Sequence, residues 1–136
     1  MIRLHDLIGQ QAISLATAER TGTVKGIVLD GNRIIGVDVG DSIINTSAVR
    51  TFEGDVLTYD TDTPFAVDKP ATNPAGNRVL DTHGDQLGSI ADLEITASGE
   101  VETVVLDNGE RISGERLRAI GGYAAIVSAD VPPSMR

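Results

Sequence analysis

The chain has 136 residues, a net charge of −9 at pH 7, two histidines and no cysteine. This acidity argues against direct nucleic-acid binding, and the lack of cysteine excludes disulfides and thiolate chemistry. No stretch of about 18 apolar residues is present, so we expect no membrane span. The first eight residues lack the apolar core of a secretion signal, which makes a cytoplasmic location the expectation.

Residue composition favours strands over helices. Valine and isoleucine together number 26 against 10 leucines, and the chain has two phenylalanines, two tyrosines and no tryptophan. β-branched side chains are stiff and fit a pleated sheet. The sequence therefore predicts an all-β protein with an aliphatic core.

In the first half of the chain, turn residues separate short apolar stretches. Residues 23–29 are predicted to form a strand, and a tight turn at 30–32 leads into a second strand in which Ile35, Val37 and Val39 alternate with smaller or polar residues. This alternation indicates a hairpin with one buried face. Further strands are predicted at 42–45, 49–52 and 56–59, with a single capped turn at 46–48.

The middle of the chain is rich in proline. Pro64, Pro70 and Pro74 remove backbone donors and favour an extended course, so residues 61–76 are predicted to be an ordered linker. The second half then repeats the plan of the first. Its predicted strands are 86–97, 100–106, 111–113, 117–120 and 123–127, and residues 131–136 are predicted to be a flexible tail.

The two halves match position by position, which indicates an internal duplication. The matching pairs at an offset of 68 residues are Ile44 and Ile112, Val49 and Leu117, Arg50 and Arg118, Phe52 and Ile120, and Gly54 and Gly122. Upstream, Val24 and Ile27 align with Leu87 and Ile90 at an offset of 63, which assigns five extra residues to the second hairpin. Chance likeness between two β-rich segments is the alternative.

Short strands with tight turns can avoid exposed edges by curling into a barrel. We therefore predict two tandem small β-barrels of five to six short strands each, joined by the proline-containing linker. The first spans residues 1–60 and the second residues 77–130. Whether the two barrels share a core is left open by the sequence.

The glycines and apolar spacing of both halves resemble the PRC-barrel domain family. In the first half the resembling segments are 22–29, 35–39, 44–49 and 54–56, and in the second they are 87–90, 101–106, 112–117 and 122–123. Tyr123 departs from the pattern, because it stands where the first half has Asp55. The motif carries no catalytic signature.

The resemblance implies a scaffold or adaptor role. The family occurs in the cytoplasmic part of the photosynthetic reaction-centre H subunit and in ribosome-maturation factors, where it serves assembly contacts. This chain lacks the transmembrane helix of the former. In place of the latter's additional N-terminal barrel it has a second PRC-like copy.

Few residues offer catalytic or metal-binding chemistry. His5 and His83 are the only histidines, so a triad or metal cluster would need them. His83 lies between Asp81 and Asp85, but the glycine spacing of this stretch does not fit a calcium loop, and a solvated turn is our interpretation. His5 is interpreted as a surface residue. We predict no catalytic, cofactor or metal residues and no enzyme activity.

Arginine is the most suggestive polar residue type. Arg111, Arg116 and Arg118 lie within eight positions, and Arg118 matches Arg50 of the first half. On an acidic protein these four side chains are candidates for binding an acidic partner segment through bidentate hydrogen bonds. The alternative is pairing within the chain, with nearby glutamates at 110 and 115 as partners.

Three functions follow as hypotheses. The first is a non-enzymatic adaptor that binds a protein partner, with homodimer formation as an option. The second is a factor for ribosome or RNA maturation that acts through a ribosomal protein. The third is a small-ligand binder or hydrolase with carboxylates in a cleft between the barrels. We expect specific function where the copies differ, in the hairpin at 92–102, the linker or the arginine-rich turn.

Overall fold

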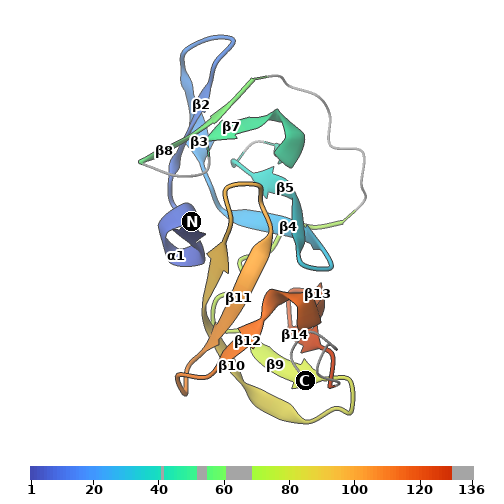
Figure 1. Cartoon of the computed structure of the whole chain (residues 1–136). Helices are drawn as coiled ribbons and strands as arrows, with labels where there is room; N and C mark the ends of the chain where they lie inside the picture. Colours follow the sequence, from blue (N-terminus) through green and yellow to red (C-terminus); the bar gives the residue numbers. More distant parts are fainter. Residues whose placement is uncertain (41, 52–54, 61–68, 130–136) are drawn as a thin grey trace.

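The computed structural model describes residues 1–40, 42–51, 55–60 and 69–129, and its regular structure is almost entirely strand (Figure 1). The first half contains β1 (Ile2–Arg3), α1 (Leu4–Leu7), β2 (Gln11–Ser14), β3 (Arg20–Thr23), β4 (Gly26–Asp30), β5 (Arg33–Asp38), β6 (Ile43–Asn45), the 3-10 turn η1 (Thr46–Ala48), β7 (Val49–Thr51) and β8 (Val56–Tyr59). The second half contains β9 (Arg78–Asp81), β10 (Gln86–Ile95), β11 (Val101–Leu106), β12 (Arg111–Ser113), η2 (Gly114–Arg116), β13 (Leu117–Ile120) and β14 (Ala124–Val127). The predicted all-β class is confirmed.

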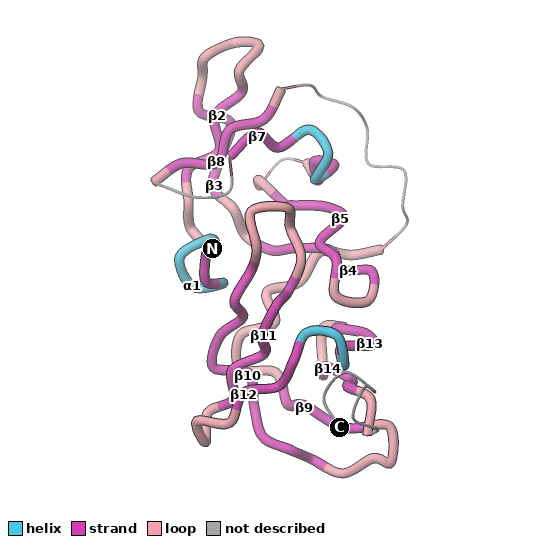
Figure 2. Tube along the Cα trace, viewed as in Figure 1, coloured by secondary structure: helices cyan, strands magenta, loops and turns pink. Residues whose placement is uncertain are grey.

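The two halves have the same strand order, as the predicted duplication requires. The second half forms a sheet in the order β12-β11-β10-β9-β14-β13, with β1 added to β10. The first half divides the same order into two sheets, β6-β5-β4 and β3-β2-β8-β7. The split falls between β3 and β4, which together correspond to the single long strand β10. Figure 2 shows η1 and η2 as short helical segments that connect strands in the two halves.

Cross-strand pairing gives the register of the duplication directly. Ile27 lies opposite Val37, and Val37 lies opposite Ile44. In the second half Leu93, Val104 and Ile112 form the same row. All six side chains are buried in the core. Ile27 therefore corresponds to Leu93, and the predicted match to Ile90 is wrong, because that match assumed five extra hairpin residues where the ladders require one.

Buried apolar side chains from both halves belong to one hydrophobic cluster, so the repeats share a core. Leu7 and Leu57 of the first half and Leu93 and Val127 of the second are all fully buried in it. Among the described residues, none of the three sheets closes on itself. The two closed barrels therefore remain a prediction.

Each repeat also pairs with a chain segment that lies at the start of the other repeat or just before it. Ile2, at the start of the first repeat, pairs with Ile95 on β10. Thr72, which precedes the second repeat, exchanges two backbone hydrogen bonds of 2.9 Å with Ile27 on β4. This reciprocal arrangement holds the repeats together without a long interface helix. None of the helices in the described ranges is long and apolar enough to cross a membrane.

The hairpin between β10 and β11 packs against the turn between β4 and β5. The Ile34 N–H donates to the Gly99 carbonyl at 2.8 Å, and the Val101 N–H donates to the Asn32 carbonyl at 2.7 Å. Arg33 and Glu100 add an exposed ion pair at 3.3 Å. This longer hairpin, one of the places where we expected function, thus serves a contact between the repeats. Residues 52–54, part of the predicted linker at 61–68, and the predicted tail at 131–136 lie outside the described residues.

Candidate functional site

A groove lies where the two repeats meet, and we call it the inter-repeat groove. Three segments line it: residues 27–31 of β4 and its turn, linker residues 69–72, and residues 118–122 at the end of β13. Its volume is about 440 Å³, within the range of about 300–1,000 Å³ typical of ligand pockets. Figure 1 shows β4 and β13 on facing sides of the boundary between the repeats.

The floor of the groove is apolar. Val28 lines it and is only 2% exposed, although this side chain is not part of the shared core cluster. It belongs to β4, whose first four residues are all buried, so this strand has apolar neighbours on both faces. Ala71 and Ile120 line the groove as half-buried residues. An occupant of the groove would therefore contact aliphatic side chains.

The rim of the groove is cationic. Lys69 and Arg118 both line it and are exposed, and neither makes a hydrogen bond or ion pair within the described part of the chain. Among the described residues of the lining, Asp30 supplies the one carboxylate. Two cations with no partner among the described residues therefore line the groove of a chain whose net charge is −9. The groove therefore attracts an anionic group more strongly than the acidic surface around it does.

The four arginines singled out from the sequence have different surroundings, and only Arg118 lines the groove. Arg50 binds the Asp60 carboxylate on the surface of the first repeat. Arg111 binds Glu94 across the sheet. Arg116 donates two guanidinium N–H groups to the Ser128 carbonyl, at 2.9 and 2.7 Å. Arg50, Arg111 and Arg116 therefore have partners within the chain, though not the glutamates at 110 and 115 that we considered.

The pairing of Arg111 with Glu94 alters the ionisation of the carboxylate. The side-chain hydrogen bond from Arg111 lowers the pKa of Glu94 below its ordinary value, and the charges of Arg111 and Arg3 act in the same direction. Partial burial opposes the shift but is the weaker effect. The same hydrogen bond raises the pKa of Arg111. This pair is therefore a structural contact at the surface of the sheet.

An exposed tyrosine stands at one end of the groove. Tyr123 follows the groove residues Gly121 and Gly122 and is 72% exposed, the highest value among the exposed large apolar side chains of the described residues. The Arg78 guanidinium lies 5.1 Å from the centre of its ring, within the range of a cation–π contact. The Asn77 side-chain amide holds the loop by donating to the Gly121 carbonyl at 2.9 Å.

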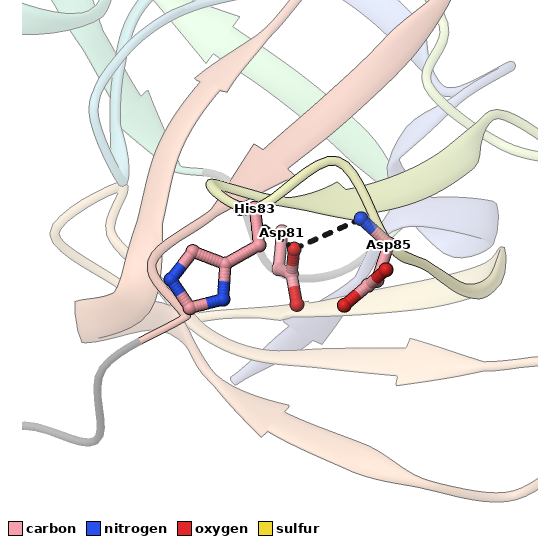
Figure 3. Close-up of side chains that lie close together, drawn as sticks. All are labelled: Asp81, His83 and Asp85. Atoms are coloured by element: carbon pink, nitrogen blue, oxygen red, sulfur yellow. Dashed lines mark hydrogen bonds between the residues drawn. The ribbon is translucent and has the colours of Figure 1, made fainter.

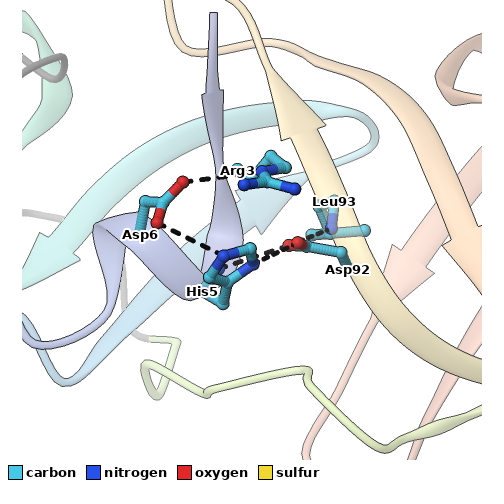
Figure 4. A network of polar contacts seen from close by, with 5 residues as sticks. All are labelled: Arg3, His5, Asp6, Asp92 and Leu93. Carbon is cyan, nitrogen blue, oxygen red and sulfur yellow. Dashed lines mark hydrogen bonds and ion pairs between the residues drawn. The ribbon is translucent and has the colours of Figure 1, made fainter.

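A second polar network joins the N-terminal segment to the second repeat (Figure 4). His5 contacts the Asp92 carboxylate through Nδ1 and lies 3.3 Å from Asp6 through Nε2. Asp92 lies on β10 and is only 9% exposed. His5, predicted to be a plain surface residue, is half exposed but is tied to a buried carboxylate. Together with Asp6, Gln10 and Asp55 it also borders a more polar hollow of about 590 Å³.

One group of described residues could present metal-ligating atoms together. Asp81, His83 and Asp85 lie on the turn between β9 and β10, with one ligand atom of each within 4.8 Å of the others (Figure 3). One oxygen of Asp81 already accepts the backbone N–H groups of His83 at 2.8 Å and of Asp85 at 3.0 Å. These hydrogen bonds account for the closeness of the three residues, because the Asp81 side chain stabilises the turn that carries the other two.

No protein-family model matches the chain, and no curated protein matches it. The resemblance to PRC-barrel domains is therefore untested by these comparisons. The inter-repeat groove, with Lys69 and Arg118, is the strongest candidate site that the structure offers. Sequence reasoning identified Arg118 but not Lys69, because nothing in the linker's composition indicates that it lies beside β13.

Proposed function

We propose that the chain is a non-enzymatic adaptor, built from tandem PRC-barrel-like repeats, that binds an acidic segment of a protein partner in the inter-repeat groove. The single observation that carries the proposal is that Lys69 and Arg118, which have no partner among the described residues, lie above an apolar floor on a strongly acidic protein. Such a site gains affinity for carboxylates from charge complementarity and affinity for apolar side chains from burial.

The repeat topology supports the barrel-like part of this proposal. In the second repeat the two end strands of the sheet, β12 and β13, follow each other in the chain and are joined by η2. The first repeat has the same connection through η1. The adaptor role is supported by the position of the groove, because a binding site shared by two repeats uses residues of both. The ribosome-related and hydrolase hypotheses remain predictions.

A photo-crosslinking experiment tests the adaptor role. A benzoylphenylalanine is placed at Ala119, which is exposed and lines the groove, and a control carries it at Ala97, which is exposed in the hairpin between β10 and β11 and does not line the groove. We expect one reproducible protein adduct in lysate from Ala119 and none of the same mass from Ala97. The adduct from Ala119 should be lost in the Arg118→Glu variant. Identical adducts from both positions would contradict the proposal.

A further inference from the structure

We propose that the partner segment is extended and amphipathic, alternating acidic and aliphatic residues, and that Tyr123 with Arg78 forms the outer end of its docking surface. This inference rests on the proposed function and specifies the chemistry of the occupant. It requires a partner that reaches from Lys69 and Arg118 across two glycines to the tyrosine.

The groove favours an alternating segment for geometric reasons. Its floor is aliphatic, through Val28 and Ile120, whereas its cations are exposed at the rim. Successive side chains of an extended chain point to opposite sides, so alternate residues can face the floor while the others face the cations and solvent. A purely acidic segment would leave the floor without an apolar partner. A purely apolar one would leave both cations unpaired.

Tyr123 has the properties of an interface anchor. It is 72% exposed yet held by Arg78 at 5.1 Å, so little conformational freedom would be lost on binding. Tyrosine and arginine are the residue types enriched in binding hot spots. Gly121 and Gly122 lie between the groove and the ring, and a side-chain carbon on either would have no other heavy atom within 4 Å. This open stretch leaves a path for a polypeptide chain.

The occupant is a polypeptide rather than a small amphiphile because the surface extends beyond the groove. A short carboxylate could satisfy Arg118 and the floor, but it would not reach Tyr123. The asymmetry between repeats agrees with a dedicated site, since Tyr123 replaces Asp55 at the corresponding position of the first repeat. There the corresponding Arg50 is bound to Asp60. At these two positions the first repeat therefore has a paired arginine and an aspartate, where the second has a tyrosine and an arginine with no partner among the described residues.

Fluorescence anisotropy on the purified full chain tests the inference. The probe is a fluorescein-labelled peptide of alternating glutamate and leucine, compared with an all-glutamate peptide and one of alternating lysine and leucine. We expect the first to bind most tightly. Arg118→Glu should weaken its binding at least about tenfold, whereas Arg20→Glu, an identical charge change at an exposed cation on β3, should weaken it less than about twofold.

The aromatic end is tested separately. Tyr123→Ala should weaken binding about threefold to tenfold, and Tyr123→Phe, which keeps the stacked ring, should bind like the wild type. Leu15→Ala removes another exposed apolar side chain, far from the groove in sequence, and should have no effect.

Each contrary result would refute a particular part of the proposal. Equal affinity for the all-glutamate peptide, or tighter binding of the lysine peptide, would refute the amphipathic acidic occupant. Complete displacement of the probe by dodecanoate together with an inert Tyr123→Ala variant would show a small-amphiphile site instead. If no peptide binds while the Ala119 crosslink persists and depends on Arg118, the adaptor proposal stands and this inference fails. Loss of the crosslink with peptide binding intact would refute the adaptor role and leave the peptide chemistry of the groove standing.

Discussion

The Asp92 carboxylate holds His5 from a position 87 residues away in the sequence. One oxygen contacts the imidazole Nδ1, and the other accepts the backbone N–H groups of His5 at 3.2 Å and of Leu93 at 2.9 Å. Asp92 lies on β10, the strand to which β1 is added. This contact therefore fixes the N-terminal segment of the first repeat against the second repeat.

Replacing Asp92 by alanine should destabilise the protein by about 2 kcal/mol, because two backbone donors and the imidazole lose their acceptor in a largely buried place. Urea unfolding monitored by circular dichroism measures the change. Asp6→Ala is the matched control, since its contacts with Arg3 and His5 are half exposed and should contribute less than about 1 kcal/mol. Equal effects of the two variants would show that Asp92 does not anchor the segment.

The sequence predicted the local hairpins well because their signals are local. Turn glycines and alternating apolar residues indicated β5, β6 and β11, and the offset of 68 matched Ile44 with Ile112 as the ladders do, although the upstream match of Ile27 was wrong. Strands β2 and β9 were overlooked. Each has four residues and pairs on one side with the next strand in the chain, β3 or β10, and on the other side in parallel with a distant strand, β8 or β14. Four residues carry little apolar periodicity, and no short-range pattern records the parallel pairing.

The same reason limited the prediction of the site. Arg118 was found because the duplication aligned it with Arg50. That Arg111 and Arg116 have partners in the chain depends on the carboxylate or carbonyl that folding brings beside each of them, which the sequence does not indicate. His5 was assigned to the surface because a single histidine in a polar segment gives no sign of a partner on β10. α1 has one turn and no side-chain hydrogen bond at its N-cap, so packing of Leu4 and Leu7 and the contact of His5 with Asp92 stabilise it rather than a local signal.

Gly114 should be intolerant of any side chain. A Cβ built at this position would lie 1.8 Å from the Val101 carbonyl oxygen, which is backbone and cannot move aside without disturbing β11. We expect Gly114→Ala to destabilise the protein by about 3 kcal/mol or more. Thermal unfolding of this variant beside Gly121→Ala provides the comparison, since a Cβ at Gly121 meets no atom within 4 Å. A Gly114→Ala protein as stable as Gly121→Ala would mean that β11 and η2 are packed differently.

The Glu94–Arg111 pair should make stability depend on pH in one direction. Since the hydrogen bond from Arg111 lowers the pKa of Glu94 in the folded protein, the pair stabilises the fold above the ordinary carboxyl pKa. That stabilisation is lost as the pH falls through the lowered pKa. Arg111→Ala should thus be less stable than the wild type at neutral pH, and the difference should shrink in strong acid.

NMR titration of the Glu94 side chain provides the direct measurement, with an expected rise of its pKa in the Arg111→Ala variant. Glu94→Gln serves as the control, because it should remove most of the pH dependence of the Arg111 effect. A Glu94 pKa that does not move when Arg111 is removed would show that the guanidinium is not its main partner.

Arg116 and Arg118 should separate stability from binding although they lie two residues apart. Arg116 holds the Ser128 carbonyl with two N–H groups, and the Ser128 N–H donates back to the Arg116 carbonyl at 2.7 Å. Arg116→Ala should therefore cost about 1–2 kcal/mol of unfolding free energy. Arg118→Ala breaks no side-chain hydrogen bond or ion pair among the described residues and should change it by less than about 0.5 kcal/mol. A simultaneous charge reversal of both residues would mix the two effects, so the single variants are required. Chemical denaturation and peptide anisotropy on the same samples measure the two effects separately. If the Arg118→Ala protein is as stable as the wild type and binds the glutamate–leucine peptide equally tightly, Arg118 is not part of the docking surface.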